Sequence, residues 1–296
     1  MHIVVAGSHG LIGTALVSAL RGRGDRVQRL VRGAAEHADD VSWDPDAGRL
    51  DPGALRGADA VVNLAGVNVG TRRLTESRKR AVILSRTRTT GLLSTTLASL
   101  DAPAPVLLQA SGIGAYGDRG DEVLDESAPL GDTFFAGVVR QWEGATAPAE
   151  RAGVRVAHLR SGIVLAPGGG ALARILPLVR AGIAGPLGSG RQYWSWITLT
   201  DEVRAILHLL DVPVSGPVNL VATAATNAEV TSALARAVHR PAVVPVPAWA
   251  VRLGLGEFAQ EVLGSVRAVP RALLDSGFTH THPEIDSAAE FVTRSR

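Results

Sequence analysis

The chain has 296 residues, of which 46% are hydrophobic and 20% are charged, and its formal net charge is +2 at pH 7. These values are typical of a folded globular protein, and they exclude a disordered chain and a strongly basic protein that binds nucleic acid or membrane surfaces by charge. The absence of cysteine excludes disulfides and thiolate chemistry, and no stretch approaches the ~20 apolar residues of a membrane span. Because the chain opens directly in a strand pattern, without a signal-peptide layout, we expect a cytoplasmic protein.

The first thirty-three residues have the pattern of a strand, a glycine turn, a helix and a second strand. The apolar run 2–7 predicts a buried parallel strand, and the apolar residues within 11–20 recur at helical spacing. The stretch 26–33 predicts the next strand. Together these segments have the size of a βαβ unit.

Three glycines, Gly7, Gly10 and Gly13, form a GxxGxxG pattern at the turn between this strand and this helix. Glycine permits a tight turn and a close approach of backbone to phosphate, and the helix amino terminus adds free N–H groups and a positive dipole end. In the strand–turn–helix context, the pattern predicts a dinucleotide site rather than a merely structural turn. The predicted contacts are Gly7, Ser8, Gly10, Leu11, Ile12 and Gly13.

Arg32 stands at the position that distinguishes NAD from NADP. An acidic residue about 20 positions after the glycine pattern would accept hydrogen bonds from the adenosine ribose of NAD. Arg32 occupies that place, and a guanidinium can form charge-assisted bonds to the 2′-phosphate of NADP. Arg29 is close in sequence, but strand alternation turns it to another side. The alternative is a surface arginine at a strand end; because no acid competes for the position, we expect NADP(H).

The rest of the chain alternates apolar runs with helical patterns. Further strands are expected within 59–66, 104–118, 154–170 and 216–222, and later helices at 226–238, 247–263 and 268–276. This alternation predicts an α/β protein with a doubly wound parallel sheet of the Rossmann type. Glycine and proline become frequent after residue 166, which marks a departure from the regular sheet. We therefore expect an NADP-binding domain over 1–165, with its last strand returning at 216–222, and a small, mostly helical substrate-side domain over 166–296.

A basic run lies between residues 71 and 90, where six arginines and Lys79 face one acid, Glu76. Three interpretations compete: a solvated helix face, a nucleic-acid patch, or one or two arginines that face the cofactor or a substrate phosphate. The segment has no aromatic residue, although nucleic-acid surfaces usually add aromatics or a wider basic area. We expect a solvated face for most of these residues and no nucleic-acid partner.

Several stretches resemble one family, and they occur in order along nearly the whole chain. They include GSHGLIGTAL, VVNLAGVNV, SRTRTT, SGIGAYGD, WEGA, RSGIVLAPGGGAL, GPLGSGRQYWSWI and LLDSGFTHTHPEI. The chain resembles the extended, sugar-nucleotide-epimerase-like branch of the short-chain dehydrogenase/reductase superfamily. More closely, it is similar to the atypical epimerase family proteins that carry a carboxy-terminal domain of unknown function.

The resemblance also implies an acid/base pair that this chain lacks. In that superfamily a tyrosine is the general acid/base, and a lysine four residues later lowers its pKa. Counting back from Glu143, which matches the glutamate after that motif, places Phe135 and Val139 at the two positions. Neither of the two tyrosines is followed by lysine at this spacing, so the dyad exists nowhere in the sequence.

Ser111 and Tyr116 are the remaining candidates for catalysis. The superfamily places its serine four residues before the YG pair, where this chain has Gly112, and Ser111 stands one position earlier. Tyr116 is the only phenol near the expected catalytic strand end, with packing in the YG turn as its alternative role. We expect proton transfer from Ser111, Tyr116, a water or the substrate itself.

The resemblance implies further contacts, residue by residue. The cofactor contacts are Leu64, Ala65 and Gly66 over the adenosine, Arg86 beside the cofactor, and Val164 at the nicotinamide side. The substrate contacts are Gly188, Gln192 and Trp196. The eight histidines lack ligand spacing, so we expect no metal site.

Two functions of different classes are compatible with these features. The first is an NADP(H)-binding, epimerase-like oxidoreductase of unknown small-molecule substrate that works without the dyad. The alternative is a non-catalytic NADPH-binding regulatory or sensor protein, in line with the cell-division label that some relatives carry. A homodimer through the helix that contains Phe134, Val138 and Trp142 is a further expectation, although these residues would suit the core equally well.

Overall fold

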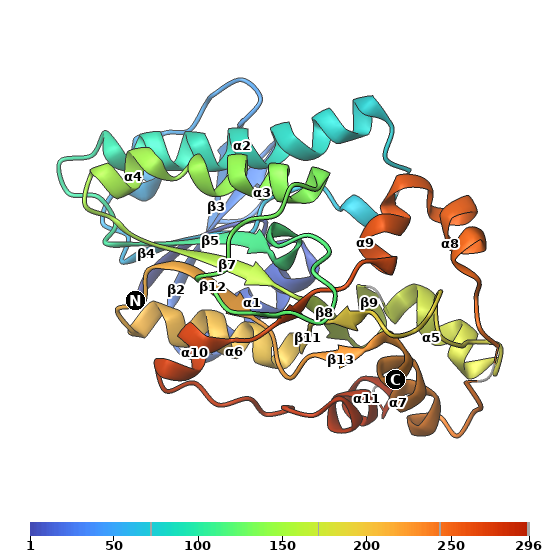
Figure 1. Cartoon of the computed structure of the whole chain (residues 1–296). Coiled ribbons are helices and arrows are strands. Elements are labelled where there is room, and N and C mark those ends of the chain that lie inside the picture. Colours follow the sequence, from blue (N-terminus) through green and yellow to red (C-terminus); the bar gives the residue numbers. More distant parts are fainter. Residues whose placement is uncertain (72, 171, 243, 295–296) are drawn as a thin grey trace.

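Seven parallel strands form the central sheet in the computed structural model of the protein (Figure 1), which describes residues 1–71, 73–170, 172–242 and 244–294. From one edge to the other they are β12 (Gly216–Leu220), β7 (Arg155–Ser161), β5 (Val106–Gly112), β4 (Ala60–Asn63), β1 (His2–Ala6), β2 (Arg26–Arg32) and β3 (Asp40–Trp43). The strand order reverses between β1 and β4. In open α/β sheets, ligands bind beside the carboxyl ends of the strands at such a point.

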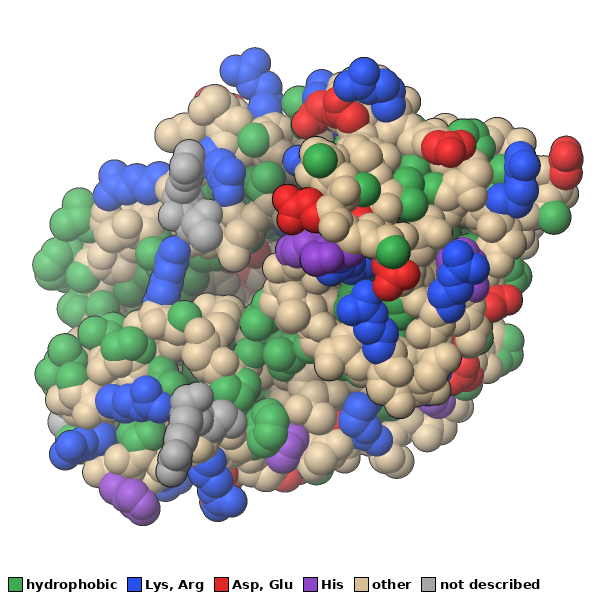
Figure 2. Space-filling model, turned by 180° about the vertical axis from the view of Figure 1, so that it is seen from behind, with side chains coloured by type: hydrophobic (Ala, Val, Ile, Leu, Met, Phe, Trp, Pro, Cys, Tyr) green, Lys and Arg blue, Asp and Glu red, His purple; other side chains and the backbone are tan. Residues whose placement is uncertain are grey.

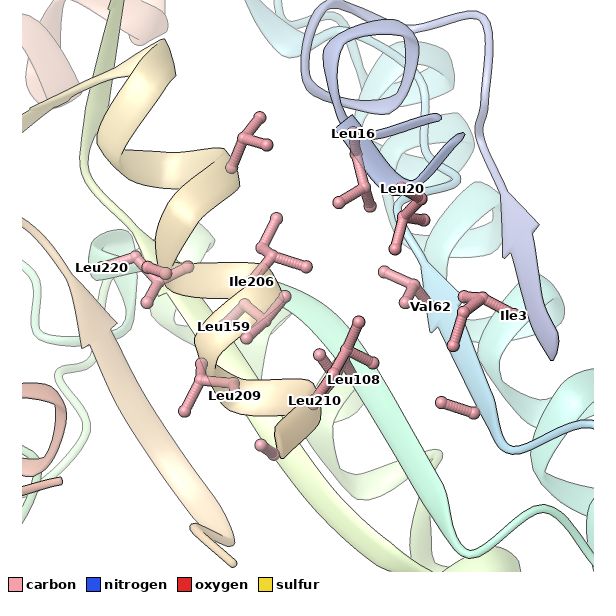
Figure 3. Close-up of a cluster of buried hydrophobic side chains, with 14 of the residues drawn as sticks. Ile3, Leu16, Leu20, Val62, Leu108, Leu159, Ile206, Leu209, Leu210 and Leu220 are labelled. Carbon is pink, nitrogen blue, oxygen red and sulfur yellow. The ribbon is translucent and has the colours of Figure 1, made fainter. Parts of the chain in front are cut away.

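One face of the sheet is covered by α1 (Leu11–Gly22), α6 (Leu199–Asp211) and α10 (Arg271–Asp275) (Figure 1). Figure 3 shows Leu16 and Leu20 of α1 directed toward Ile3 and Val62 of the sheet, with Ile206 of α6 alongside. These five side chains are fully buried, and burial of each stabilises the fold by about 1.5–3 kcal/mol.

The opposite face carries α2 (Glu76–Ala98), α3 (Phe134–Gly144) and α4 (Ala147–Arg151) (Figure 1). Successive side chains of a strand point to opposite faces, so Val4 packs toward Leu93 and Leu97 of α2 while its neighbours pack toward α1. Thr75 and Thr133 begin α2 and α3 as N-caps, because each hydroxyl accepts a backbone N–H of the first turn.

The C-terminal unit, drawn at the right and lower right of Figure 1, is mostly helical. Its helices are α5 (Leu172–Arg180), α7 (Asn227–Ala237), α8 (Ala248–Leu255), the short η4 (Gly256–Phe258), α9 (Ala259–Leu263) and α11 (Ile285–Arg294). Short strands join it to the sheet: β8 (Ile163–Ala166), β9 (Gly169–Gly170), β11 (Trp196–Thr198), β10 (Tyr193–Trp194), β13 (Ala225–Thr226), β6 (Val123–Leu124) and β14 (Arg267–Ala268). Seen from behind in Figure 2, the surface is hollowed between two lobes on the left, and hydrophobic side chains gather on both lobes.

The predicted α/β architecture is confirmed, with differences at the level of elements. The short edge strand β3 and the terminal helix α11 were not predicted. The helix expected over 247–263 is divided by Gly256, whose φ of +60° ends α8. The strand expected to return at 216–222 is β12, which pairs with β7, whereas α6, within the range 166–296 given to the second domain, also packs on the main sheet. The C-terminal unit is therefore discontinuous in the chain.

Candidate cofactor and active site

The turn between β1 and α1 has no room for a side chain at two of its glycines. Gly7 has a φ of +81°, and a carbon added to it would lie 2.6 Å from the Leu64 carbonyl carbon. A carbon added to Gly13 would lie 2.2 Å from the Gly7 oxygen. The turn therefore presents backbone rather than side chains at its surface. Such a cradle fits the pyrophosphate of a dinucleotide.

The amino end of α1 is left open for an anion. Gly10 is the N-cap and offers no side-chain hydrogen bond, and the first turn contains no acidic residue, so the positive end of the helix is not neutralised locally. Ser8 is buried beside the turn, and Ile12 packs toward the core and can contribute through its backbone. Leu11 is exposed, and a carbon added to Gly169 would lie 2.7 Å from its Cδ1. Strand β9, in the hairpin with β8, thus lies over the beginning of α1.

Arg32 ends β2 at the same edge of the sheet as the glycine turn. Ala6 pairs with Leu30, so Arg32 lies two residues past the level at which β1 ends. Its side chain is exposed and has no hydrogen-bond or ion-pair partner among the residues that the structure describes. Arg29, in contrast, binds Asp40 at 2.7 Å. Strand alternation therefore places Arg29 in a structural ion pair and leaves Arg32 available to a ligand.

The loop after β4, residues 64–66, is held in a fixed position beside the glycine turn. Asn63 accepts the N–H of Ala65 at 3.1 Å through its side-chain oxygen. Ser85 of α2 accepts the N–H of Val67 at 3.3 Å. The loop expected over the adenosine is therefore tied at both ends, next to the point where the sheet order reverses.

Arg86 is a half-buried cation without a carboxylate partner in the described part of the chain. It donates to the carbonyl oxygens of Val67 and Val82, at 3.2 Å each, and its guanidinium lies 4.8 Å from the centre of a Trp142 ring. Burial and, to a lesser extent, the charge of Arg78 lower the pKa of Arg86 to about 10. A cation in such an unfavourable place fits a site that receives an anionic ligand.

Four of the other basic residues of 71–90 have separate partners, and Arg80 is exposed. These contacts join Arg73 to the Leu253 carbonyl, Arg78 to the Asn68 carbonyl, Arg88 to Asp46, and Lys79 to Glu76 and Glu257. Arg72 lies outside the described residues. The run is therefore divided between surface ion pairs and the two arginines, Arg78 and Arg86, that reach the loop after β4.

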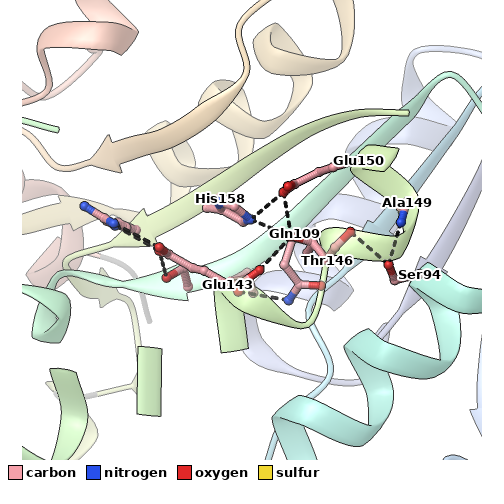
Figure 4. Close-up of polar contacts among 10 residues, drawn as sticks. Ser94, Gln109, Glu143, Thr146, Ala149, Glu150 and His158 are labelled. Carbon is pink, nitrogen blue, oxygen red and sulfur yellow. Dashed lines mark hydrogen bonds and ion pairs between the residues drawn. The ribbon is translucent and has the colours of Figure 1, made fainter. Parts of the chain in front are cut away.

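Ser111, near the end of β5, belongs to a buried ion-pair network. Its Oγ donates to Glu143 at 2.7 Å, and Arg160 of β7 binds both Glu143 oxygens at 2.9 Å. Burial opposes the charge of Glu143, but the bonds and charge of Arg160 outweigh it and hold the pKa of that carboxyl below its ordinary value. Figure 4 shows Glu143 in this network, with the contact between His158 and Thr146 nearby.

Tyr116 is fully buried in the same network. Its hydroxyl donates to Asn219 at 2.7 Å and accepts from Arg160 at 3.1 Å. Burial raises the pKa of Tyr116 above its ordinary value, so this phenol is not poised for proton transfer near neutral pH. Of the two roles that the sequence left open, the geometry favours packing; catalysis by Tyr116 stays a prediction.

The two positions of the missing dyad, 135 and 139, carry side chains of α3 that pack against their neighbours. The Phe135 ring lies 5.0 Å from the Phe134 ring, and Val139 is buried. Val138 and Trp142, which could have served a dimer, are also buried, and the Trp142 indole donates to Thr90. A homodimer stays a prediction, without support from these two side chains.

The residues expected to contact substrate lie in different environments. Trp196 is 1% exposed within the core of the C-terminal unit, and Gln192 donates to the Leu187 carbonyl and braces its own loop. Gly188 lies against α9, since a carbon added to it would be 3.1 Å from Leu263 Cδ2. Val164 lies on β8, beyond the end of β7, and packs against the main core. Contact of these residues with a substrate or nicotinamide stays a prediction.

Sequence patterns did not single out Glu261 of α9, which the fold brings to the end of β5. Its carboxylate approaches Gly114, three residues after Ser111. Burial raises the pKa of Glu261 to about 7. No local signal predicts this placement, because residues 114 and 261 meet only through the packing of α9.

The described ranges contain no helix with the length and apolar character needed to cross a membrane. Within the same ranges, no three His, Cys, Asp or Glu side chains gather as a metal site would require.

Comparison with known proteins gives a consistent assignment. A family model described as "NAD dependent epimerase/dehydratase family" matches residues 3–225, and one described as a domain of unknown function, DUF1731, matches residues 246–292. Epimerase family protein MT2273 of Mycobacterium tuberculosis is 46% identical over 294 residues, which cover 98% of this chain and 97% of that protein. Epimerase family protein SDR39U1 of Mus musculus is 36% identical over 299 residues, 99% of each chain.

Two solved structures are also similar over nearly the whole chain. The crystal structure of human epimerase family protein SDR39U1 (isoform2) with NADPH has a TM-score of 0.92 and 32% identity and covers 100% of both chains. A nucleoside-diphosphate sugar epimerase from Corynebacterium glutamicum has a TM-score of 0.81 and 33% identity, covering 99% of this chain and 58% of that one. The chain belongs to the NAD dependent epimerase/dehydratase family, in which it is similar to the epimerase family proteins named SDR39U1.

Proposed function

We propose that this protein is an NADP(H)-dependent oxidoreductase that interconverts a carbonyl and an alcohol on a small-molecule substrate. The observation that carries the proposal is the cradle at residues 7–13, where a side-chain carbon at Gly7 or Gly13 would collide with backbone. A turn that excludes side chains and ends in an uncapped helix amino terminus suits a pyrophosphate.

Three positive features around this cradle supply the cofactor contacts in our proposal. The N–H groups at the start of α1 bind the pyrophosphate, and Arg32, which has no side-chain partner in the described ranges, binds the 2′-phosphate. Arg86 offers a desolvated cation at the loop after β4. The preference for NADP(H) is supported by Arg32 and by the NADPH complex of the human relative. The cofactor, when bound, supplies or accepts hydride.

Ser111 has a limited role in this proposal. Because its hydroxyl proton is donated to Glu143, its oxygen can accept a hydrogen bond from a substrate hydroxyl but does not present a donor to a carbonyl. Ser111 can therefore help to hold the alcohol form of the substrate. The proton that the carbonyl oxygen receives on reduction must come from another group.

The test is consumption of NADPH by the purified protein in a panel of small aldehydes, ketones and nucleotide-linked keto sugars. We expect consumption with at least one carbonyl compound, loss of activity in Gly13→Ala, and retention in Gly22→Ala, where an added carbon meets open space. Tight binding of NADPH without consumption across the panel would contradict the proposal and favour a regulatory protein.

A further inference from the structure

Helix α9 lies over the place where the superfamily's tyrosine would stand. Phe135 occupies that position, and its ring is 6.2 Å from the Phe258 ring at the start of α9. A carbon added to Gly114 would lie 3.3 Å from Phe135 Cβ and 3.4 Å from a carboxylate oxygen of Glu261. The η3 turn (Ile113–Ala115) after β5, the start of α3, and α9 therefore converge on one point. The Glu261 carboxylate lies at this point, next to the position of the missing phenol.

No fixed partner holds the Glu261 carboxylate in one charge state. Neither of its oxygens has a hydrogen-bond or ion-pair partner within the described ranges, and both keep contact with solvent space. Other carboxylates at this end of the sheet are engaged, since Glu143 is bound by Arg160 and Glu257 by Lys79. Glu261 is thus free to exchange a proton with a molecule bound beside it.

The surroundings of Glu261 support both of its protonation states near neutral pH. Burial alone, without a contribution from a neighbouring charge, raises the pKa of Glu261 to about 7. This is the pKa range that general acid/base catalysis uses. The charged groups on the neighbouring segments are Glu257, Lys79, Arg73, Arg252 and Asp118. Lys79 binds Glu257, Arg73 binds a backbone carbonyl, and Asp118 accepts the N–H of Ser265, while Arg252 is exposed.

We propose that Glu261 performs the proton transfer that a tyrosine performs elsewhere in the superfamily, so that the C-terminal unit completes the active site. The proposal rests on the oxidoreductase function proposed above. It gives a chemical reason for the coexistence of an intact cofactor cradle with the loss of the tyrosine and lysine at positions 135 and 139. It also gives the domain of unknown function a direct part in the reaction.

The proton balance of the step is simple. In reduction, NADPH supplies hydride to the carbonyl carbon and is oxidised to NADP⁺. The O–H bond of the neutral Glu261 carboxyl breaks, an O–H bond forms on the substrate oxygen, and a carboxylate remains. Solvent then returns a proton to the carboxylate. In oxidation the Glu261 carboxylate accepts the proton of the substrate hydroxyl.

The experiment measures the reduction of 4-nitrobenzaldehyde at saturating NADPH, from about pH 5 to about pH 9. It compares the wild type with Glu261→Gln, Glu261→Asp and the control Glu257→Gln. We expect Glu261→Gln to bind NADPH within about twofold of the wild type and to lose roughly 10²–10⁴-fold in kcat. The wild-type rate should fall as pH rises through about 7, because the carboxyl must be protonated to donate. This limb should persist in Glu261→Asp and Glu257→Gln and vanish in Glu261→Gln.

The outcomes separate the two proposals. A wild-type rate and pH limb in Glu261→Gln would overturn the assignment of Glu261 and leave the oxidoreductase intact. NADPH binding without wild-type turnover of any compound in the carbonyl panel would overturn both. A second measurement, carboxyl ¹³C NMR of glutamate-labelled protein, follows the resonance that Glu261→Gln removes. Titration of that resonance in the ordinary glutamate range, unaffected by NADPH, would also overturn the assignment of Glu261, whatever the turnover.

Discussion

At the scale of single residues, Gly13 shows how strictly the phosphate turn depends on a missing side chain. A carbon there would lie 2.2 Å from the Gly7 oxygen and 2.9 Å from the Ser8 Cα. We expect Gly13→Ala to lower the free energy of unfolding by about 1–3 kcal/mol through overpacking, and to weaken NADPH binding. Gly22→Ala, in open space at the end of the same helix, should instead be neutral or stabilise by up to about 1 kcal/mol. Urea unfolding of both variants measures the difference; equal stabilities would contradict the tight turn.

The ion pair of Glu143 and Arg160 makes a prediction about pH. The pKa of Glu143 is held below its ordinary value of 4.5, so the folded state gains stability above that pH and loses it as pH falls through the lowered pKa. Removal of the charge by Glu143→Gln leaves Arg160, 5% exposed at its side chain, without its partner and should cost about 3–5 kcal/mol at pH 7. Unfolding free energies should show the gap between variant and wild type shrinking below pH 4.5. A gap that does not change with pH would show that Glu143 acts by shape alone.

Some residues of the site could be predicted from the sequence and others could not. The glycines and Arg32 follow fixed spacings within one βαβ unit, so local sequence places them. The loss of the dyad follows from register with Glu143. Glu261 has no such register, because it reaches Gly114 only through the docking of α9, and a lone glutamate in an amphipathic helix carries no local signal of a site.

At the scale of elements, helix α6 is held to β7 by a buried acid. Glu202 is fully buried, accepts from the Ser161 hydroxyl at 2.6 Å and has a second oxygen without a partner among the described residues. Burial raises the pKa of Glu202 to about 7. The unfolded chain releases this proton near pH 4.5, whereas the folded chain retains it up to about pH 7. The free energy of unfolding therefore falls as pH rises through this window.

We therefore expect Glu202→Gln to gain stability relative to the wild type as pH rises. The free energy of unfolding of the wild type should fall by up to about 3 kcal/mol more than that of Glu202→Gln between about pH 5 and pH 8. Chemical denaturation at the two pH values measures this difference. Parallel pH dependences in the two proteins would contradict a neutral, buried Glu202 and place its charge in the folded state.

Element prediction succeeded in the first βαβ unit and missed several elements farther along the chain. The β1–α1–β2 unit has buried strands and a clear helical stripe, and it lies where the sequence placed it. The strand β3 has four residues and only one buried side chain, so its alternation is weak. Helix α11 was missed although the face that carries its two buried alanines and one buried valine contrasts clearly with its polar face. The break between α8 and α9 required knowledge that Gly256 adopts a positive φ.

At the scale of the whole molecule, the cofactor cradle and the proposed proton-transfer group come from opposite ends of the chain. The cradle lies in the first thirteen residues, whereas Glu261 belongs to the segment that matches DUF1731. Segments 3–225 and 246–292 are therefore expected to depend on one another for activity. The parallel sheet, whose order reverses between β1 and β4, brings the two ends together beside the carboxyl ends of the strands.

The measurement that tests the central claim most directly is a fluorescence titration of the protein with NADPH and with NADH. It is carried out on the wild type, on Arg32→Glu and on the control Arg26→Glu, which reverses an exposed charge at the other end of the same strand. The account predicts that the wild type binds NADPH more tightly than NADH. In Arg32→Glu this preference should fall by about tenfold or more, because a hydrogen bond to a charged group contributes about 1.5–3 kcal/mol. Arg26→Glu should retain the preference. Absence of binding of either nucleotide to the wild type would contradict the account, and an unchanged preference in Arg32→Glu would contradict the role of Arg32.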